Sequence, residues 1–247
     1  MGLLDAVSAR AARILPGNPV RSKLDRAVAS ITFDDIPASA ARVGAPILEA
    51  AGVRGTFYMC GGHAGQAFEG RVQHDVDDIR ALHAAGHEIA CHTFAHPRVT
   101  RIDDAAREAD RRRNAGFVRE ALGDVQLSSF AYPYGAVSPG AKRFYGERFL
   151  TCRGVRSGLN HDVADFADLR AVALERRLHD RVRLREVIAK AVETRAWMIV
   201  FTHDVEADPS PWGCTPDDLE DLLTALSDAR VPVAPVKAAA AEVLFGR

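Results

Sequence analysis

The sequence lacks any continuous apolar run that could cross a membrane or form the apolar core of a secretion signal. Near the N-terminus, Asp5 and Arg10 interrupt the apolar residues, whereas a signal peptide needs an unbroken apolar stretch of about 7–15 residues. A membrane span needs about 20 such residues. We therefore expect a cytoplasmic protein with no membrane span, in which residues 1–27 form a short amphipathic helical lead-in.

Cysteine is scarce, and no two cysteines are close in the sequence. The four are Cys60, Cys91, Cys152 and Cys214. Without a CxxC pair, neither a zinc ribbon nor a thioredoxin-type dithiol is supported. Reduced thiols fit a cytosolic protein.

Neither sign of charge predominates, and no linker divides the chain. The 32 Lys and Arg residues against 33 Asp and Glu residues give a net charge of -1. The arginines form no basic stripe, so nucleic acid is not an expected partner. No Gly/Ser/Pro-rich segment separates two halves, and 47% of the 247 residues are hydrophobic. These features predict one domain over residues 28–247 with a large core.

Short β-type runs alternate with segments of helical periodicity. The expected strands are residues 28–33, 55–59, 88–91, 129–131, 149–152, 171–174, 198–202 and 231–234. The expected helices are residues 39–51, 75–85, 103–122, 182–195 and 215–230. This alternation predicts βαβ units, and so many units in one chain favour a distorted (β/α) barrel of seven or eight parallel strands over an open sheet.

Polar clusters follow four of the expected strands, and in a parallel barrel they would meet at one mouth. The clusters are Asp34-Asp35, the segment from His92 to His96, the segment from Tyr132 to Gly135, and His203-Asp204. Barrel enzymes place catalytic groups at the carboxyl ends of the strands. Each cluster also has a simpler interpretation, as a helix N-cap, a turn or a polar strand end. Their convergence at one mouth favours a functional site.

The combination of residue types indicates a metal hydrolase. Two imidazoles and one carboxylate form a three-ligand site that leaves positions open for water and substrate, and zinc is the expected ion. A second carboxylate would act as a base on the activated water, and a histidine from another strand would protonate the leaving group.

Four motifs occur in order along the chain: Thr32-Phe33-Asp34-Asp35, His92-Thr93-x-x-His96, Phe130-Ala131-Tyr132-Pro133-Tyr134-Gly135 and Phe201-Thr202-His203-Asp204. They resemble the motifs of the polysaccharide deacetylases with a NodB-homology domain, a family like carbohydrate esterase family 4. The resemblance runs from about residue 28 to 236 and implies a distorted, often seven-stranded barrel.

The resemblance also implies a role for each matching residue. Asp34 would be the general base, and Asp35, His92 and His96 would hold the metal. The backbone N–H of Tyr134 would bind the tetrahedral oxyanion together with the ion. His203 would be the general acid.

The sequence departs from the family pattern at three points. Ile36 and Ala131 stand where the family commonly has glycine and an arginine that braces the base. The Asp-Trp motif that orients the acid histidine is not evident, and the candidates are Asp162, Asp165, Asp168 and the adjacent Asp204. Trp212 is expected at the mouth, either stacking on a sugar ring or anchoring a loop.

The sequence therefore predicts a metal-dependent carbohydrate deacetylase, a hydrolase of non-peptide carbon–nitrogen bonds, with N-acetyl favoured over O-acetyl groups. Zn²⁺ is the expected cofactor, with Co²⁺, Ni²⁺ or Mn²⁺ as alternatives. The expected partner is an acetylated carbohydrate, such as an exopolysaccharide or capsule precursor, and the sequence specifies no oligomeric state. Two alternatives remain: a hydrolase of a small amide or cyclic ureide, and a non-catalytic glycan-binding barrel.

Overall fold

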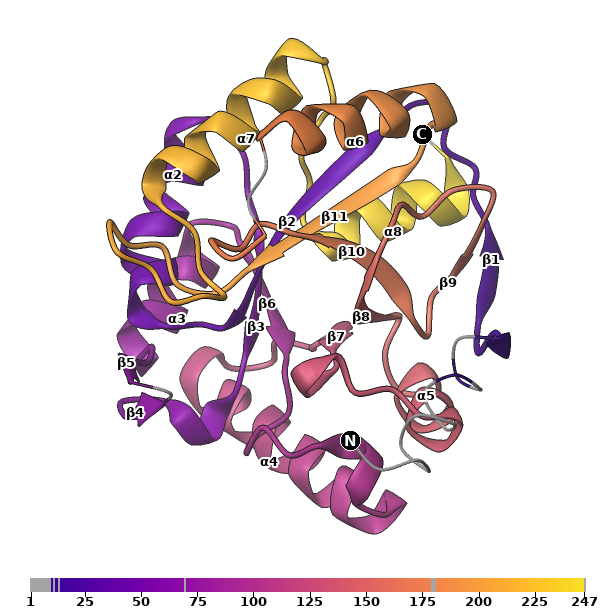
Figure 1. The fold of residues 1–247 in the computed structure, drawn as a ribbon. Helices are drawn as coiled ribbons and strands as arrows, with labels where there is room; N and C mark the ends of the chain where they lie inside the picture. The colour runs from indigo at the N-terminus through magenta and orange to yellow at the C-terminus, as the bar shows by residue number, and fades with distance from the viewer. Residues whose placement is uncertain (1–9, 11, 13, 69, 179–180, 247) are drawn as a thin grey trace.

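Seven parallel strands form a closed barrel in the computed structural model, which describes residues 10, 12, 14–68, 70–178 and 181–246 (Figure 1). Around the barrel the strand order is β10-β11-β2-β3-β6-β7-β8. The strands are β2 (Val28–Asp35), β3 (Thr56–Met59), β6 (Glu88–Cys91), β7 (Ser129–Ala131), β8 (Thr151–Ser157), β10 (Leu169–Ala173) and β11 (Trp197–Thr202). The predicted (β/α) barrel is confirmed, with seven strands.

Helices surround the barrel and follow its strands along the chain (Figure 1). They are α2 (Ala45–Ala50), α3 (Val76–Ala84), α4 (Asp104–Leu122), α5 (Pro139–Gly146), α6 (Arg181–Thr194), α7 (Pro216–Asp228) and α8 (Val236–Phe245). Short helical turns add η1 (Ala40–Gly44), η2 (Gly61–His63), η3 (Val99–Arg101) and η4 (Pro133–Gly135).

Some predicted element boundaries were wrong. Residues 231–234 form no barrel strand and contribute a single bridge between Ala29 and Val233. The strand predicted over 149–152 is β8, which continues to Ser157. Two small antiparallel pairs were not predicted: β1 (Pro19–Arg21) with β9 (Val163–Asp165), and β4 (Ala67–Phe68) with β5 (Arg71–Val72). These pairs lie outside the barrel.

Strand β2 is buried along its whole length, as expected for a strand covered on both faces. Ile31 and Phe33 pack in the large cluster that also contains Leu48 of α2 and Leu222 of α7. Because successive side chains alternate between the faces of a strand, Asp34 falls on the opposite face. The strand pattern itself therefore aims this carboxylate away from the helical layer.

Side-chain caps explain where several helices begin. Asp75 and Asp78 form a reciprocal capping box at the start of α3, and Thr215 and Asp218 form another at the start of α7. Asp103 accepts a hydrogen bond from the Ala106 N–H at the start of α4. Each cap satisfies backbone N–H groups that the first turn leaves without a partner.

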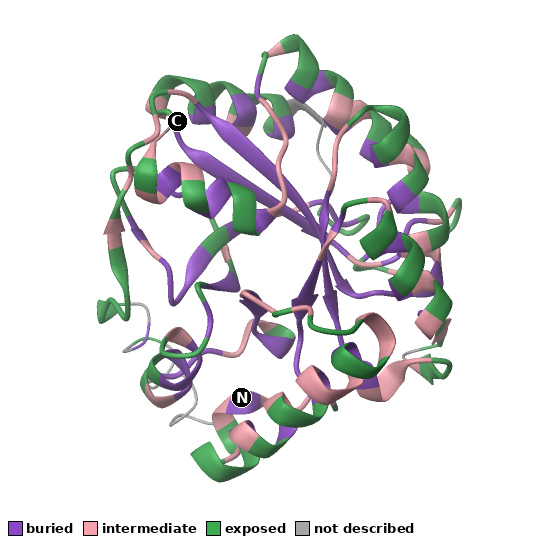
Figure 2. Cartoon of the chain, turned by 180° about the vertical axis from the view of Figure 1, so that it is seen from behind, coloured by how far each residue is buried: buried purple, intermediate pink, exposed green. Residues whose placement is uncertain are grey.

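Helix α8 packs against the amino-terminal ends of the strands. Val236 and Val243 share an apolar cluster with Val28 and Trp197, the first residues of β2 and β11. Figure 2 shows the buried strands enclosed by helices whose outer faces are exposed. The opposite, carboxyl-terminal end of the barrel is therefore the end left open for a site.

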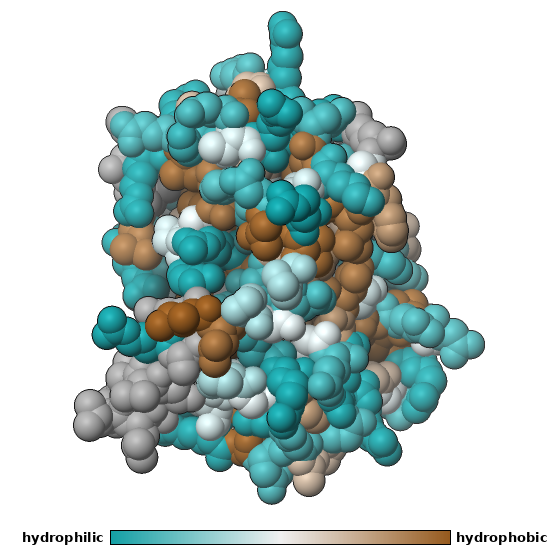
Figure 3. Space-filling view, turned by 90° about the vertical axis from the view of Figure 1, so that its right-hand side faces the viewer, coloured by the Kyte–Doolittle hydropathy of each residue, from teal (hydrophilic) through white to brown (hydrophobic). Residues whose placement is uncertain are grey.

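The predicted helical lead-in over residues 1–27 lies partly outside the described residues. Arg10, Ala12 and Ile14 are helical, and Pro19–Arg21 form strand β1. Among the described residues, no helix combines the length and apolar character that a membrane crossing requires. On the face turned to the viewer in Figure 3, hydrophilic side chains predominate and hydrophobic ones show between them.

Candidate metal centre and active site

The polar side chains predicted at the strand ends gather around one cavity of about 340 Å³. They come from the carboxyl ends of β2, β6, β7 and β11, which the closed barrel brings together. The cavity is lined by Asp34, Asp35, His92, His96, Arg98, Tyr132, Tyr134, Gly135, Val155, Glu175, Arg177, Phe201, His203 and Trp212. All six residues predicted for the site are present in this lining.

Asp35, His92 and His96 offer ligand atoms that lie within 4.8 Å of one another. Asp35 Oδ1 is 3.6 Å from His92 Nε2 and 3.3 Å from His96 Nε2. Two zinc bonds of about 2 Å at a tetrahedral angle place their donor atoms roughly 3.3 Å apart. The donor spacing and chemistry therefore fit a divalent ion.

Both histidines turn Nε2 toward Asp35 and can offer this nitrogen to a metal. His92 Nδ1 donates to the Ala131 carbonyl oxygen at 2.9 Å, which sets the tautomer. His96 Nδ1 is buried without a hydrogen-bond partner. Burial of His96, together with the nearby His92, lowers its pKa to about 3, so the ring is in the neutral form that metals require.

Helix α4 holds the backbone of the segment from His92 to His96. Both carboxylate oxygens of Asp110 accept hydrogen bonds, from the Phe94 N–H at 2.7 Å and the Ala95 N–H at 3.0 Å. His96 has a positive φ of 50°, and its N–H donates to Thr93 Oγ1 at 3.0 Å. This local fold, rather than a helix, brings two histidines four residues apart to one point.

A second group of possible ligands, Asp35, Cys60 and His63, shares the same aspartate. The Cys60 thiol donates to the His92 carbonyl oxygen at 3.0 Å. Burial, reinforced by Asp35, raises the pKa of this thiol well above its usual value. Because the thiolate is the metal-binding form, Cys60 instead supports the backbone beneath the histidine.

Asp34 forms an ion pair with Arg153, which is fully buried at the barrel interior. Burial would raise the pKa of Asp34, but the charge and hydrogen bond of Arg153, with His92 and His203, outweigh it and lower this pKa. Arg153 lies on β8 directly opposite Ala131 of β7 in the strand register. An arginine of β8, the strand next to β7, therefore braces this aspartate across the barrel.

His203 lies at the rim, and its Nδ1 is 3.3 Å from the Trp212 carbonyl oxygen. The three aspartates considered for orienting it are elsewhere: Asp162 is beside His161, Asp165 accepts from Asn18 N–H, and Asp168 is near Arg156. Asp204 is buried and hydrogen-bonded to Ser210.

Tyr134 lies within η4 with a positive φ of 58°, and its ring is exposed at the cavity. The ring is 4.4 Å from that of His96, and the Arg98 guanidinium lies 4.9 Å from its centre. Trp212 carries a similar contact, since the Arg177 guanidinium lies 3.6 Å from its ring centre. Two aromatic rings thus flank the cavity.

Sequence reasoning missed Arg153, Glu175 and Arg177. Glu175 is buried, and its carboxylate accepts from Arg177 Nε at 2.7 Å. Burial raises the pKa of Glu175, against a lowering by Arg177. Both residues follow β10, and Arg153 lies beyond the predicted end of β8. Arg153 directly follows the residues predicted as a strand, 149–152, and a polar residue at that strand end was the signal that could have found it.

Known proteins resemble this chain in sequence and in fold. The polysaccharide deacetylase family profile matches residues 21–146, whereas no curated protein matches the sequence. Many solved structures share the fold. A polysaccharide deacetylase described as putative, from Mycobacterium smegmatis, superposes with a TM-score of 0.61 at 18% identity, covering 93% of this chain and 94% of that one.

Two carbohydrate esterases also share the fold. A family 4 acetyl xylan esterase from Clostridium thermocellum, solved with a cobalt ion, has a TM-score of 0.60 at 17% identity, covering 85% of this chain and 89% of its own. A family 4 carbohydrate esterase from Streptomyces lividans, solved with acetate, has a TM-score of 0.59 at 18% identity, covering 85% and 92%. The family profile spans half of the sequence, and the chain belongs to the polysaccharide deacetylase family.

Proposed function

We propose that this protein is a metal-dependent hydrolase that removes an acetyl group from a carbohydrate, with N-acetyl groups favoured over O-acetyl groups. The observation that carries the proposal is the convergence of Asp35, His92 and His96 beside Asp34 and His203 in one cavity. Family membership supports the same conclusion. So do the acetate and cobalt found in two proteins of the same fold.

We propose Asp35, His92 and His96 as the metal ligands and zinc as the ion, because two imidazoles and one carboxylate form a common zinc site. Cobalt, nickel or manganese would be accepted by the same donors. The bound ion would supply a Lewis acid that polarises the acetyl carbonyl and makes water more acidic.

Asp34 is the proposed general base. Its lowered pKa keeps the carboxylate ionised at neutral pH, and its ion pair with Arg153 fixes its position at the floor of the cavity. It would accept the proton of the attacking water. General base catalysis of this kind contributes about 10²–10⁴-fold to a rate.

His203 is the proposed general acid. With Nδ1 donating to the Trp212 carbonyl oxygen, Nε2 is the nitrogen that would protonate the departing amine or hydroxyl. The backbone N–H of Tyr134 would donate to the oxyanion, a contribution typically of about 3–4 kcal/mol to the barrier. Asp34 and His203 thus hold the two proton-transfer roles on separate strands.

The alternatives differ in substrate or in catalysis. A small amide or cyclic ureide would use the same residues, whereas a non-catalytic barrel was suggested by the missing arginine at Ala131. The pairing of Arg153 with Asp34 removes that reason. The exposed rings of Tyr134 and Trp212 beside the cavity favour a sugar, since aromatic faces stack on apolar ring surfaces.

The test is acetate release by zinc-reconstituted protein from N-acetylated and O-acetylated oligosaccharides, compared with small amides and a cyclic ureide. We expect turnover of the acetylated sugars and its loss in Asp34→Asn with zinc retained. His203→Ala should be slower but still hold zinc, and His96→Ala should lose it. Turnover of the non-sugar amides alone would refute the carbohydrate assignment.

A further inference from the structure

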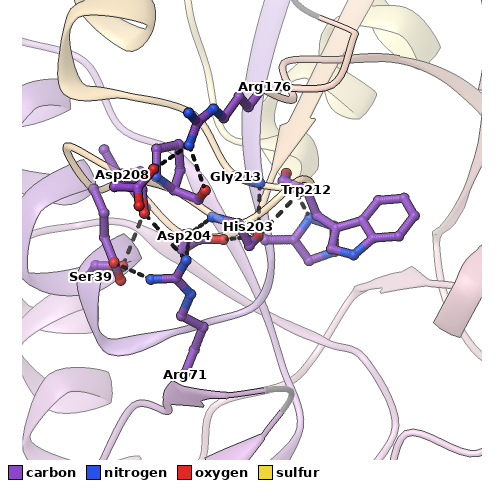
Figure 4. A network of polar contacts seen from close by, with 12 residues as sticks. Ser39, Arg71, Arg176, His203, Asp204, Asp208, Trp212 and Gly213 are labelled. Atoms are coloured by element: carbon purple, nitrogen blue, oxygen red, sulfur yellow. Dashed lines mark hydrogen bonds and ion pairs between the residues drawn. The ribbon is translucent and has the colours of Figure 1, made fainter.

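The loop after β11 is organised around the buried carboxylate of Asp204, as Figure 4 shows. Asp204 Oδ2 accepts a hydrogen bond from the Ser210 N–H at 2.6 Å, and Oδ1 accepts from Ser210 Oγ at 2.5 Å. Its backbone carbonyl accepts from the Cys214 N–H at 3.0 Å. One residue thus holds the middle and the end of the loop that runs from 205 to 214.

The Ser210 hydroxyl in turn stabilises the turn that follows it. Its oxygen accepts hydrogen bonds from the Trp212 N–H and the Gly213 N–H, both at 3.2 Å. One O–H donor and two accepted bonds use the full capacity of a serine hydroxyl. A side chain at Gly213 would place its Cβ 2.5 Å from Asp204 Cγ, so the turn packs directly on the carboxylate.

This turn determines where the backbone carbonyl group of Trp212 lies. The Trp212 carbonyl oxygen lies 3.3 Å from His203 Nδ1 (Figure 4). The Trp212 ring is held from its other side by Arg177, whose guanidinium is paired with the buried Glu175. The carbonyl that orients the imidazole is therefore fixed by hydrogen bonds at its backbone and by packing at its side chain.

Strand β5, outside the barrel, supplies a positive charge that compensates the charge of Asp204. Arg71 of β5 places Nη2 3.7 Å from Asp204 Oδ2 and 3.3 Å from the Asp208 carbonyl oxygen, and it also pairs with Glu206. Removing one partner of a buried charge pair is costly because the other is left uncompensated. The β4–β5 pair thus stabilises the loop from outside the barrel.

We propose that Asp204 is a positioning residue for proton donation: through Ser210 it folds the 205–214 loop so that the Trp212 carbonyl holds His203 with Nε2 toward the leaving group. The inference rests on the proposed role of His203 as general acid. Asp204 acts without touching the imidazole, because its carboxylate oxygens are engaged by Ser210 and Arg71.

The test compares substrates that differ in their need for a proton. An N-acetylated oligosaccharide has a poor leaving group, whereas the phenolate of p-nitrophenyl acetate departs without protonation. In zinc-reconstituted protein, Asp204→Asn and Ser210→Ala should lower kcat on the oligosaccharide by about 10-fold or more. KM and zinc content should change little, and kcat on p-nitrophenyl acetate should be nearly retained.

Two reference variants complete the experiment. Asp208→Asn makes the same change in charge in the same loop, at a side chain that is 90% exposed and pairs with Arg176, and it should leave both activities at the wild-type level. His203→Ala defines the full loss expected without the acid. Ser210→Ala retains the buried charge pair, so it decides the question if Asp204→Asn fails to fold.

The outcomes separate this inference from the proposed function. If His203→Ala loses activity selectively on the oligosaccharide while Asp204→Asn and Ser210→Ala lose both activities equally or neither, the positioning role is wrong and the proposed function stands. If wild-type protein with bound zinc releases no acetate from any acetylated sugar, the proposed function fails and the positioning role fails with it.

Discussion

The arginine that pairs with Asp34, the proposed general base, lies one strand away from its place in the family pattern. Ala131 stands where an arginine was expected, and Arg153 reaches Asp34 from the directly opposite position on β8. Arg153 also lies 5.1 Å from the ring centre of Tyr58 and 5.0 Å from that of Phe201. The guanidinium is therefore held between two aromatic rings within the barrel.

Replacing Arg153 with methionine should shift the acidic limb of the kcat/KM profile to higher pH. Without the arginine, the desolvation of buried Asp34 is no longer outweighed, so its pKa rises. Arg156→Gln, three residues further along β8, should leave the profile unchanged. The measurement is a pH–rate series from pH 4 to 9, restricted to pH values at which both proteins remain folded. An unchanged acidic limb in Arg153→Met would contradict the assignment of Asp34 as base.

The same pair links stability to pH. Asp34 has a lowered pKa in the folded state, so its stabilising contribution is complete above the unfolded value of about 3.9 and is lost as pH falls through the folded value. Arg153→Met leaves a buried carboxylate unpaired and should lower the free energy of unfolding by about 3–5 kcal/mol at neutral pH. Urea unfolding of wild type and Arg153→Met at pH 7 and pH 4 measures the effect. At pH 4 wild type still has the contribution, whereas burial raises the pKa of the unpaired carboxyl in Arg153→Met and leaves it protonated, so a smaller difference between the two proteins is expected at pH 4.

Local sequence predicted that the proposed metal ligands and the proposed base gather at one mouth, but not the residues that support them. Asp34, Asp35, His92 and His96 follow recognisable strands, so their gathering followed from the barrel topology alone. Arg153 depends on the register between β7 and β8, a tertiary property that no local pattern carries. Ile36 keeps a positive φ of 53° where the family commonly has glycine, at a cost of about 1–3 kcal/mol, and that departure from the family pattern was the one sign of the strain.

At the scale of elements, the sequence predicted the buried barrel strands well but missed the short strand pairs outside the barrel. Strands β2, β6 and β11 are buried along nearly their whole length and rich in apolar residues, which marks them in the sequence. The pairs β1–β9 and β4–β5 are two or three residues long and form between segments whose pairing is set by the rest of the fold. The pair β4–β5 nevertheless carries Arg71, which contacts Asp204 and the 205–214 loop after it.

Glu88 at the start of β6 ties helix α8 to the barrel end opposite the site. Its carboxylate accepts hydrogen bonds from Thr56 Oγ1, Ser129 Oγ and the Lys237 N–H in the first turn of α8. An anion at a helix N-terminus is stabilising. Glu88→Ala should lower the free energy of unfolding by about 1–3 kcal/mol, because buried donors lose their acceptor.

Because Glu88 is remote from the metal ligands, kcat per folded molecule should not change. Denaturant unfolding and acetate release on the same preparation provide the measurement. Glu193→Ala, at a side chain 69% exposed on α6, is the matched control and should alter stability by less than about 0.5 kcal/mol. A loss of kcat without loss of stability in Glu88→Ala would show that α8 communicates with the site.

At the scale of the whole molecule, the proposed metal centre joins segments far apart in the chain. Asp35 ends β2, whereas His92 and His96 follow β6, with β3 between them in the sheet. An ion that binds all three ligands therefore stabilises the native pairing of these strands and has no equivalent site in the unfolded chain. Metal binding and folding should be thermodynamically linked.

Removing the metal with a chelator should accordingly lower Tm, and adding zinc should restore it. At a free zinc concentration 100 times Kd, the native state gains about 2.7 kcal/mol, and for a domain of this size that corresponds to a Tm increase of roughly 5–10 °C. His96→Ala should show little of this increase, because one of three ligands is lost, whereas His203→Ala should show all of it. Calorimetry with and without zinc decides: an equal increase in wild type and His96→Ala would mean that zinc binds elsewhere, and the site built from Asp35, His92 and His96 would then be wrong.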